Sequence, residues 1–255
     1  MLNLMYPVNL VKGSNSKKLQ SRNAQTASVV AEAAEATPAV FGKTAGATLL
    51  AKKVMVLNEL TLESELFGGL SPDEVKVEQG LAVSEKVDTD ACALFPGFSN
   101  TAGTTGVALT IDKMIEADYK AGLSFAPGAR IFVLGNVQIL HLKQYIVTSG
   151  ASVWANPMVS NLLGEQAQPN GFVGYILNRA VFETQHVPLV NSNADRCGAC
   201  LNPMYALAAA YVRPPNTEVE GNSSKRTREV STDYFYDVKE RLDGAGCGII
   251  SKATA

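Results

Sequence analysis

The chain has 255 residues, 46% hydrophobic and 18% charged, and its 22 basic and 24 acidic residues give a formal net charge of −2. This composition is typical of a globular protein with one large or two modest domains, and it excludes a strongly cationic nucleic-acid-binding protein. No run of 18 apolar residues is present, so no membrane-spanning helix is expected, and the opening MLNLMYPVNLVKG does not resemble a signal peptide. Four cysteines are too few for a disulfide framework, so we expect reduced, cytoplasmic thiols.

The first 28 residues are rich in Asn, Ser, Lys and Gln and have no sustained hydrophobic period. We expect a flexible arm that becomes ordered only against a partner. Up to residue 30 there is no acidic residue, and there are four basic ones: Lys12, Lys17, Lys18 and Arg22. Four charges with little aromatic interleaving predict weak, non-specific contact with nucleic-acid phosphates at most. ASVVAEAAEA, residues 27–36, predicts a short helix.

An extended excursion is predicted between Pro38 and Thr61. Gly42 and Gly46 interrupt its first half, and its second half is apolar around Lys52-Lys53. We interpret the segment as a hairpin-like loop that returns through VMVLNEL.

The clearest structural signal is a long helix between Ser71 and Phe95. Ser71, Pro72 and Glu74 form an N-terminal signature, a capping box with proline at the first helical position, and Pro96-Gly97 ends the pattern. About 23 residues give roughly 35 Å of helix. The residues at helical spacing are Val77, Leu81, Ser84, Val87, Ala91 and Phe95. A half-apolar helix of this length is expected to lie on its own domain with one side and to face water or a neighbouring subunit with the other.

The remaining chain predicts interleaved helices and strands. GFSNTAGTTG reads as a loop, TIDKMIEADYKAGL as a helix, ARIFVLG as a buried strand and VQILHLKQYI as a helix. A loop-rich region, GASVWANPMVSNLLGE, precedes strands in GFVGYILNRAVFETQHVPLV. NPMYALAAAYVRPP predicts a short helix or strand, and the chain finishes with two strands around Gly244–Gly246. Because strands and helices do not alternate as strict βαβ units, the fold class is α+β.

The sharpest chemical candidate is the pair Cys197 and Cys200 in Cys-Gly-Ala-Cys. A zinc site would need two further ligands, and no second paired motif is present among the available residues Cys92, Cys247, His141 and His186. A thioredoxin-like site would need a helix after the motif, whereas Leu201-Asn202-Pro203 follows. Two buried structural thiols are the simpler interpretation.

Three other patterns point to chemistry less strongly. Gly103-Thr104-Thr105-Gly106 lacks the Gly-Lys-Ser/Thr ending of a phosphate loop, and Asn222-Ser223-Ser224 fits a glycosylation sequon in a chain without a recognisable signal peptide. Among Glu59, Glu63 and Glu65, the first two would share a face on a helix and could act as an acid/base pair. A solvated turn, or an acidic rim that pairs with Lys52 and Lys53 of a neighbouring copy, is the alternative. We therefore expect no catalytic, cofactor-binding or metal-binding residue.

Several stretches resemble the major capsid proteins of tailed bacteriophages, which have the Hong-Kong-97-like fold that encapsulin shells share. Lys52 to Leu66 is similar to the segment that leaves the extended loop in that family. GLAVSEKVDTDACALFPGFSNTAGTTGVALTIDKMIEA resembles the spine helix, the step after it and the following helix. RIFVLGNVQILHLKQYI, HVPLVNSNADRCGACLNPMYALAAA and YFYDVKERLDGAGCGIIS are similar to the strand, helix and late strands of the body. The resemblance covers about residues 40–255.

The resemblance implies a domain plan. It implies an N-terminal arm at 1–28, an extended loop at 29–60, a peripheral domain at 61–128 and 225–255 with its spine helix at 72–95, and an axial domain at 129–224. No long, charged, scaffolding-like segment precedes the arm, so we expect any scaffold to be a separate protein or to have been removed. Lys43, Lys52 and Lys53 lie in the loop, but we do not predict a covalent cross-link.

The resemblance also implies a function. The chain would be a non-enzymatic capsid protein that self-assembles into pentamers and hexamers of an icosahedral phage head around double-stranded DNA. Its partners would be further copies of itself, with scaffolding, portal and decoration proteins and non-specific contact with packaged DNA; its location would be the virion, assembled in the host cytoplasm. One alternative is an encapsulin-type compartment. Another, of a different class, is a small α/β enzyme that uses Cys197 and Cys200.

Overall fold

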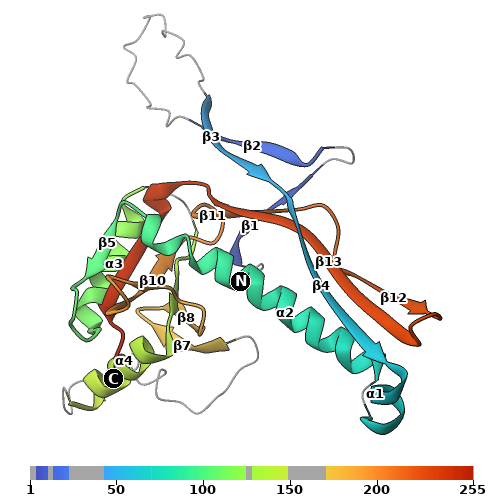
Figure 1. Cartoon of the computed structure of the whole chain (residues 1–255). Helices are drawn as coiled ribbons and strands as arrows, with labels where there is room; N and C mark the ends of the chain where they lie inside the picture. Colours follow the sequence, from blue (N-terminus) through green and yellow to red (C-terminus); the bar gives the residue numbers. More distant parts are fainter. Residues whose placement is uncertain are drawn as a thin grey trace, which may run out of the picture.

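The structure is a computed structural model that describes residues 4–10, 14–22, 43–69, 71–124, 128–148 and 171–254. Its described part has a rounded body, a long narrow extension and a two-stranded ribbon that projects from their junction (Figure 1). Each of the two larger parts is built on its own β-sheet. The long helix runs along both parts.

The predicted long helix is confirmed as α2, Pro72–Cys92, and its N-terminus has the predicted capping box. The Ser71 hydroxyl accepts the N–H of Glu74 at 3.2 Å, and the Glu74 carboxylate accepts the N–H of Ser71 at 3.0 Å. The helix ends three residues before the predicted Phe95, and Phe95–Gly97 form a short 3₁₀ turn. Proline at position 96 has no N–H to donate to the carbonyl of Cys92, so the α-helical ladder cannot continue.

The predicted buried face of α2 is partly wrong. Val77 and Leu81 are 65% and 61% exposed, whereas the buried positions are Gln79, Val83, Val87, Ala91 and Cys92. The buried stripe follows spacings of four residues and begins at a polar side chain. Gln79 can be buried because the sheet beneath it supplies hydrogen-bond partners. With Gln79 on the buried side of α2, Val77 and Leu81 face outward.

The narrow extension is a five-stranded sheet centred on β13, Thr227–Glu240. One edge of β13 pairs antiparallel with β4, Lys52–Thr61; its other edge pairs with β12, Asn216–Asn222, and then with β11, Leu207–Tyr211. Side chains of β13 alternate between buried and half-exposed, as expected of a strand with one face on a core. Val230, Thr232, Tyr234, Tyr236 and Val238 form the buried side. The short helix α1, Leu62–Phe67, follows β4 at the narrow end.

The rounded body is a seven-stranded sheet with helices on both faces. Its strand order is β5 (Thr101–Gly103), β14 (Gly246–Lys252), β10 (Asp195–Leu201), β6 (Ile131–Leu134), β8 (Arg179–Glu183) and β7 (Phe172–Ile176), with β9 (Leu189–Val190) pairing with β10. Helices α3, Ile111–Gly122, and α4, Asn136–Thr148, bury apolar residues against one face. The C-terminal half of α2 covers the other face. The predicted α3, β6, α4 and the α+β class are confirmed, although the predicted loop at 97–106 contains the short strand β5.

The expectation of a flexible arm over residues 1–28 is wrong for its described parts. Strand β1, Tyr6–Asn9, pairs in parallel with β11, and Met5 and Val8 are buried in the subunit's own cores. Strand β2, Ser16–Arg22, pairs antiparallel with β3, Lys43–Leu50, to make the ribbon. The arm has partners within its own chain, at positions too distant in sequence for a local pattern to reveal. The predicted helix at 27–36 and the predicted loop-rich region at 150–165 lie outside the described residues.

The ribbon is fixed at its base. Leu19 of β2 and Leu49 of β3 form a small core with Val8, Ala208 and Ala210. The N–H of Leu50 donates to the Asp237 carboxylate at 2.8 Å, and the N–H of Ala51 donates to the carbonyl of Asn15 at 2.8 Å. The base of the ribbon is therefore part of the subunit's packed structure.

Two buried glutamines join helices to the sheets. On α2, the Gln79 amide donates to the Asn58 side chain and to the carbonyl of Val230, and its oxygen accepts from Thr232. On α4, the Gln138 amide donates to the carbonyl of Ile249 and to the Ser251 hydroxyl, and its oxygen accepts the N–H of Gly135. Because both side chains are almost fully buried, these bonds fix where each helix sits on its sheet.

Candidate functional site

The two cysteines of the Cys-Gly-Ala-Cys motif do not form a joint site. Both lie on β10, but Cys197 packs in the core under α2, whereas Cys200 packs in the core under α3 and α4, on the opposite face of the sheet. Burial raises the pKa of Cys197 to about 12 and raises that of Cys200 well above its ordinary value. The pair therefore offers neither a reactive thiolate nor two ligands to one metal, and Cys92 and Cys247 are also buried.

The histidines and the three glutamates are dispersed. His141 is buried on α4 with its Nε2 2.9 Å from the carbonyl oxygen of Thr254, and burial lowers its pKa. His186 lies elsewhere, with its Nδ1 3.2 Å from the Thr89 hydroxyl. Glu59 and Glu63 do not share a helix face: Glu59 lies on β4, 4.0 Å from Lys225, and Glu63 lies in the first turn of α1. Over the described residues, no three His, Cys, Asp or Glu side chains are grouped to hold a metal ion.

The remaining motifs have structural contacts. In the loop after β5, the N–H of Gly106 donates to the buried Asp195 carboxylate at 2.7 Å. This loop N–H is therefore already bonded to a side chain of the protein itself. Asn222 ends β12, and its side-chain oxygen accepts from Ser224 and from the N–H of Lys225, which stabilises the turn into β13. Of the basic residues in the predicted arm, Lys17 and Lys18 are exposed on β2.

No helix in the described part of the chain is both long and apolar enough to cross a membrane.

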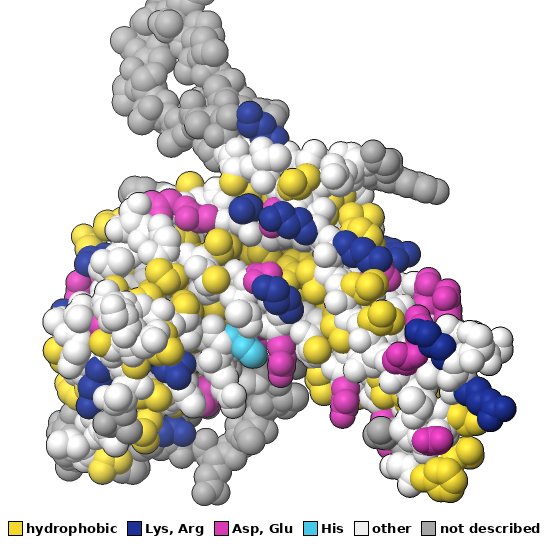
Figure 2. Space-filling model, in the orientation of Figure 1, with side chains coloured by type: hydrophobic (Ala, Val, Ile, Leu, Met, Phe, Trp, Pro, Cys, Tyr) yellow, Lys and Arg dark blue, Asp and Glu magenta, His cyan; other side chains and the backbone are white. Residues whose placement is uncertain are grey.

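The features that do require a functional explanation are the exposed apolar side chains of the narrow extension. Met55 and Leu57 of β4, and Val77 and Leu81 of α2, are more than half exposed. Figure 2 shows hydrophobic side chains gathered over β4 and α1. Large apolar side chains that cluster on a surface mark sites of association with other molecules.

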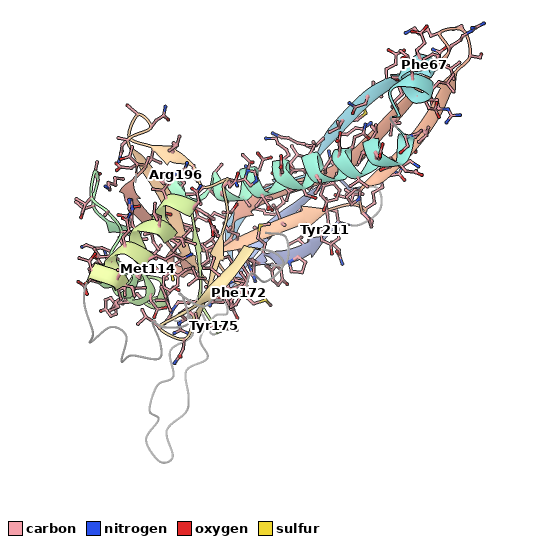
Figure 3. All side chains as sticks on the ribbon, turned by 90° about the horizontal axis from the view of Figure 1, so that it is seen from below. Phe67, Met114, Phe172, Tyr175, Arg196 and Tyr211 are labelled. Carbon is pink, nitrogen blue, oxygen red and sulfur yellow. The ribbon has the colours of Figure 1, made fainter. Side chains whose placement is uncertain are left out.

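The narrow end of the extension, which we call the tip, consists of α1 and the turn at 223–226 between β12 and β13. On α1, Leu66 is 67% exposed and Phe67 is 87% exposed. Phe67 lies at the far end of the molecule in Figure 3. A side chain of this size and exposure is typical of residues that become buried in an interface.

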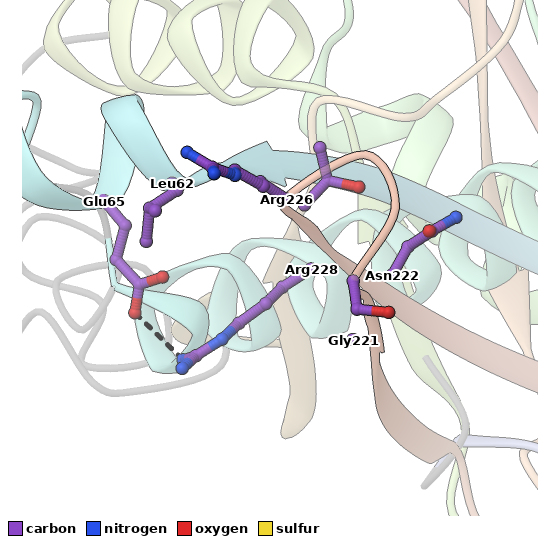
Figure 4. Close-up of a pocket in the computed structure, with 8 residues that line it drawn as sticks. Leu62, Glu65, Gly221, Asn222, Arg226 and Arg228 are labelled. Atoms are coloured by element: carbon purple, nitrogen blue, oxygen red, sulfur yellow. Dashed lines mark hydrogen bonds and ion pairs between the residues drawn. The ribbon is translucent and has the colours of Figure 1, made fainter.

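The tip also contains a pocket of about 370 Å³, which we call the tip pocket. Figure 4 shows Arg226 and Arg228 extending from the hairpin towards Leu62 and Glu65 of α1. Arg228 pairs with the Glu65 carboxylate at 2.9 Å, whereas Arg226 has no ion pair within the described ranges. The N–H of Leu62 donates to the carbonyl of Arg226 at 3.1 Å, so helix and hairpin are joined directly.

A second hollow, of about 440 Å³, lies between α2 and the segment after β8. Its acidic lining comes from Glu85, Asp88 and Glu183, and His186 also lines it. No serine or cysteine lines this hollow, and over the described ranges these groups are not arranged as a metal site.

The sequence interpretation missed α1 and the tip pocket. One available signal was the pair Leu66-Phe67 directly before Gly68-Gly69, where apolar residues meet a turn and have no local partner. The arginines in Ser-Ser-Lys-Arg-Thr-Arg were a second signal. Their proximity to α1 depends on the β4–β13 register, in which Thr61 pairs with Thr227.

The chain is similar to known proteins in its structure. No protein-family model matches the chain, and no curated protein matches its sequence. Among solved structures, the capsid of Ralstonia phage GP4 is 11% identical, with a TM-score of 0.74 over 100% of this chain and 89% of that chain. The capsid of cyanophage P-SCSP1u is 11% identical, with a TM-score of 0.73 over 99% and 88%. The SrpI encapsulin of Synechococcus elongatus PCC 7942 is 12% identical, with a TM-score of 0.64 over 96% and 84%.

These similarities cover nearly the whole chain and establish the fold. The chain has the Hong-Kong-97-like capsid fold, as the resemblance in its sequence implied.

Proposed function

We propose that the protein is the major capsid protein of a tailed phage and that it self-assembles into pentamers and hexamers of an icosahedral head around double-stranded DNA. The observation that carries this proposal is the similarity in fold to the capsids of Ralstonia phage GP4 and cyanophage P-SCSP1u, over 99–100% of this chain. On this view the protein acts through its surfaces, is not an enzyme, and is located in the virion after assembly in the host cytoplasm. Scaffolding, portal and decoration proteins would be its further partners.

The distribution of apolar side chains supports an assembling subunit. Met55, Leu57, Val77 and Leu81 are exposed along an extension that is only one sheet and one helix thick. Such a shape exposes a large surface for its volume, and a shell subunit needs large surfaces that fit further copies of itself. The dispersed cysteines, histidines and glutamates agree with a structural function.

We further propose the domain plan implied by the sequence: arm 1–28, extended loop 29–60, peripheral domain 61–128 with 225–255, and axial domain 129–224. Packing of α2 against β13 and β4 supports a peripheral domain built on the spine helix. The packing crosses these boundaries in two places. The peripheral ranges contain α3 and β14, which pack in the rounded body, and the axial range contains β11 and β12, which belong to the sheet of the extension. Limited proteolysis of unassembled subunits would test which boundaries separate stable fragments.

A second candidate is an encapsulin-type compartment, which the similarity to the SrpI encapsulin supports. Capsids and encapsulins share a fold, so the contents of the particle decide between them. The basic residues Lys17 and Lys18 on the ribbon would suit contact with DNA, but two charges do not distinguish a phage capsid from an encapsulin-type compartment.

Electron microscopy and sedimentation of the purified protein test the proposal. Closed shells tens of nanometres across are expected, and nuclease-protected double-stranded DNA in particles from infected cells would support the phage capsid. Shells that hold a protein cargo and no genome would support the compartment. A homogeneous monomer or dimer with stoichiometric metal, and an activity lost in Cys197→Ser, would instead support the cysteine enzyme.

A further inference from the structure

Phe67 is not buried by the described part of its own subunit. It is 87% exposed, and the tip pocket beside it is lined by Leu62 and Glu65 of the same helix but not by Phe67. At about 100° per residue, Phe67 projects from α1 about 200° around the axis from Glu65, which is the side opposite the pocket. Within the described residues nothing covers this ring, and a second molecule can bury it.

The tip pocket has the chemistry to receive an aromatic ring. Arg226 contributes a guanidinium without an ion pair among the described residues, and arginine stacks favourably on aromatic faces. Leu62 supplies an apolar wall, and at Gly221 an added Cβ would meet no atom within 4 Å, so this wall leaves open space. A volume of about 370 Å³ is sufficient for one phenylalanine side chain.

The walls of the pocket are fixed before any partner binds. The Arg228–Glu65 ion pair and the bond from the N–H of Leu62 to the carbonyl of Arg226 join α1 to the hairpin. Arg226 itself has a φ of +53°, a conformation that most side chains avoid. Aromatic rings and arginines in prearranged pockets are the residues that contribute most to protein interfaces.

We propose that the tip is a contact between copies of this chain, in which Phe67 of one copy inserts into the tip pocket of the next, against Arg226. The inference rests on the proposed shell function and names one of its subunit contacts. Because the ring and the pocket are different surfaces on opposite sides of α1, the contact is heterologous, and repetition around an axis beside the tip closes a ring of subunits.

The contact is small. One phenylalanine buries roughly 150–250 Å² at most, far less than the roughly 800 Å² per partner of a standard interface. It therefore cannot hold two subunits together by itself. It contributes as one weak contact repeated at every tip of an assembly that other surfaces also join.

Engineered disulfides test the geometry directly. Phe67→Cys and Gly221→Cys are prepared as separate variants, mixed before assembly, oxidised, and compared on non-reducing gels. The four native cysteines are buried, so they contribute little background. We expect disulfide-linked dimers in the mixture and none in either variant alone, and closed rings of linked subunits in the double variant.

Two outcomes would overturn the inference: shells that form without any linked dimer in the mixture, or dimers of Phe67→Cys alone, which would indicate a symmetric contact between two rings. Shell formation by the unmodified protein tests the proposed function, and the cross-link tests only the Phe67 contact. If the unmodified protein forms no shells, the proposed function fails.

Substitution of Phe67 gives a second measure of how much this contact contributes to assembly. Phe67→Ala should raise the lowest protein concentration that yields shells by roughly tenfold. Its unfolding should be unchanged, because the side chain is exposed in the free subunit. Tyr119→Ala, at a 68% exposed aromatic residue on α3, is the matched control, and an equal effect of both substitutions would contradict a specific pocket.

Discussion

Gln79 shows how one polar side chain decides which face of a helix is buried. It is 2% exposed, and its bonds to Asn58, Val230 and Thr232 link α2 to two strands of the extension. A rule that places apolar residues inside cannot predict this, because the glutamine is buried only when those strands supply its partners. The same rule placed Val77 and Leu81 in the core, where the structure leaves them exposed.

Replacing Gln79 should therefore destabilise the subunit strongly. Gln79→Ala removes the buried hydrogen bonds to Asn58, to the carbonyl of Val230 and to the Thr232 hydroxyl, although Thr232 keeps its bond with Thr217. We expect a loss of about 2–3 kcal/mol in the free energy of unfolding. Urea unfolding of unassembled subunits measures it. Glu78→Ala, one position away on the exposed side, should change it by less than about 0.5 kcal/mol. A similar small change in both variants would show that the buried bonds contribute little.

The buried thiols give the subunit a specific response to alkaline pH. Burial raises the pKa of Cys92 and of Cys197 from 9.0 to about 12. Between these values the unfolded chain has lost the thiol protons that the folded chain keeps, so the free energy of unfolding falls as pH rises above about 9. Below pH 9 both states hold the protons, and the contribution is constant.

A double variant isolates this effect from lysine titration. Urea unfolding at about pH 8 and about pH 10 should show a smaller loss of stability in Cys92→Ala/Cys197→Ala than in the unmodified protein. Identical losses in the two proteins would mean that these thiols titrate alike in the folded and unfolded states.

At the scale of single elements, local signals in the sequence predicted helix ends well. Ser71 and Glu74 act within one helical turn, and Pro96 removes one specific hydrogen bond, so neither signal depends on distant parts of the chain. The helix predicted from Thr110 is α3, which starts at Ile111, although the Thr110 side chain makes no capping hydrogen bond. Strand β1 was missed because its partner is β11, where Tyr6 pairs with Ala208, and no local pattern specifies a parallel partner so far away.

The capping box should contribute measurably to stability. Ser71→Ala removes the acceptor of the Glu74 N–H, and we expect a loss of about 1 kcal/mol in the free energy of unfolding. Ser84→Ala is the matched control on the exposed side of α2, where the hydroxyl bonds only to the carbonyl of Gly80 in the preceding turn. Because alanine favours helix, the control should be neutral or slightly stabilising. Equal effects would indicate that the cap is not formed in solution.

At the scale of the whole molecule, the N-terminal residues belong to the subunit as well as to any assembly. Met5 and Val8 are buried, and the Arg241 guanidinium lies 3.9 Å from the centre of the Tyr6 ring. Similarity to a capsid fold was predictable from sequence, but the pairing of β1 with β11 in the sheet of the extension was not. Nor was the tip, because α1 meets the 223–226 turn only through the pairing of β4 with β13.

Removal of residues 1–10 should therefore lower the stability of the free subunit before assembly is considered. Burial of the two apolar side chains contributes roughly 3–6 kcal/mol in total, and the truncated subunit should unfold at a clearly lower urea concentration. Arg241→Ala, which keeps the strand but removes the contact with Tyr6, should show a smaller loss of about 1 kcal/mol. Unchanged unfolding of the truncated chain, with a defect in shells only, would restore the interpretation of this segment as an arm.

The packed base of the ribbon has a kinetic consequence. Leu49 is fully buried, and the bond from Leu50 to Asp237 fixes the base of β3 on the five-stranded sheet, so the direction of the ribbon is set in the isolated subunit. A projecting element that already points in one direction loses little conformational freedom when it meets another molecule. A stiff ribbon would then raise the rate constant for association between molecules compared with a flexible one, even if the final contacts were the same.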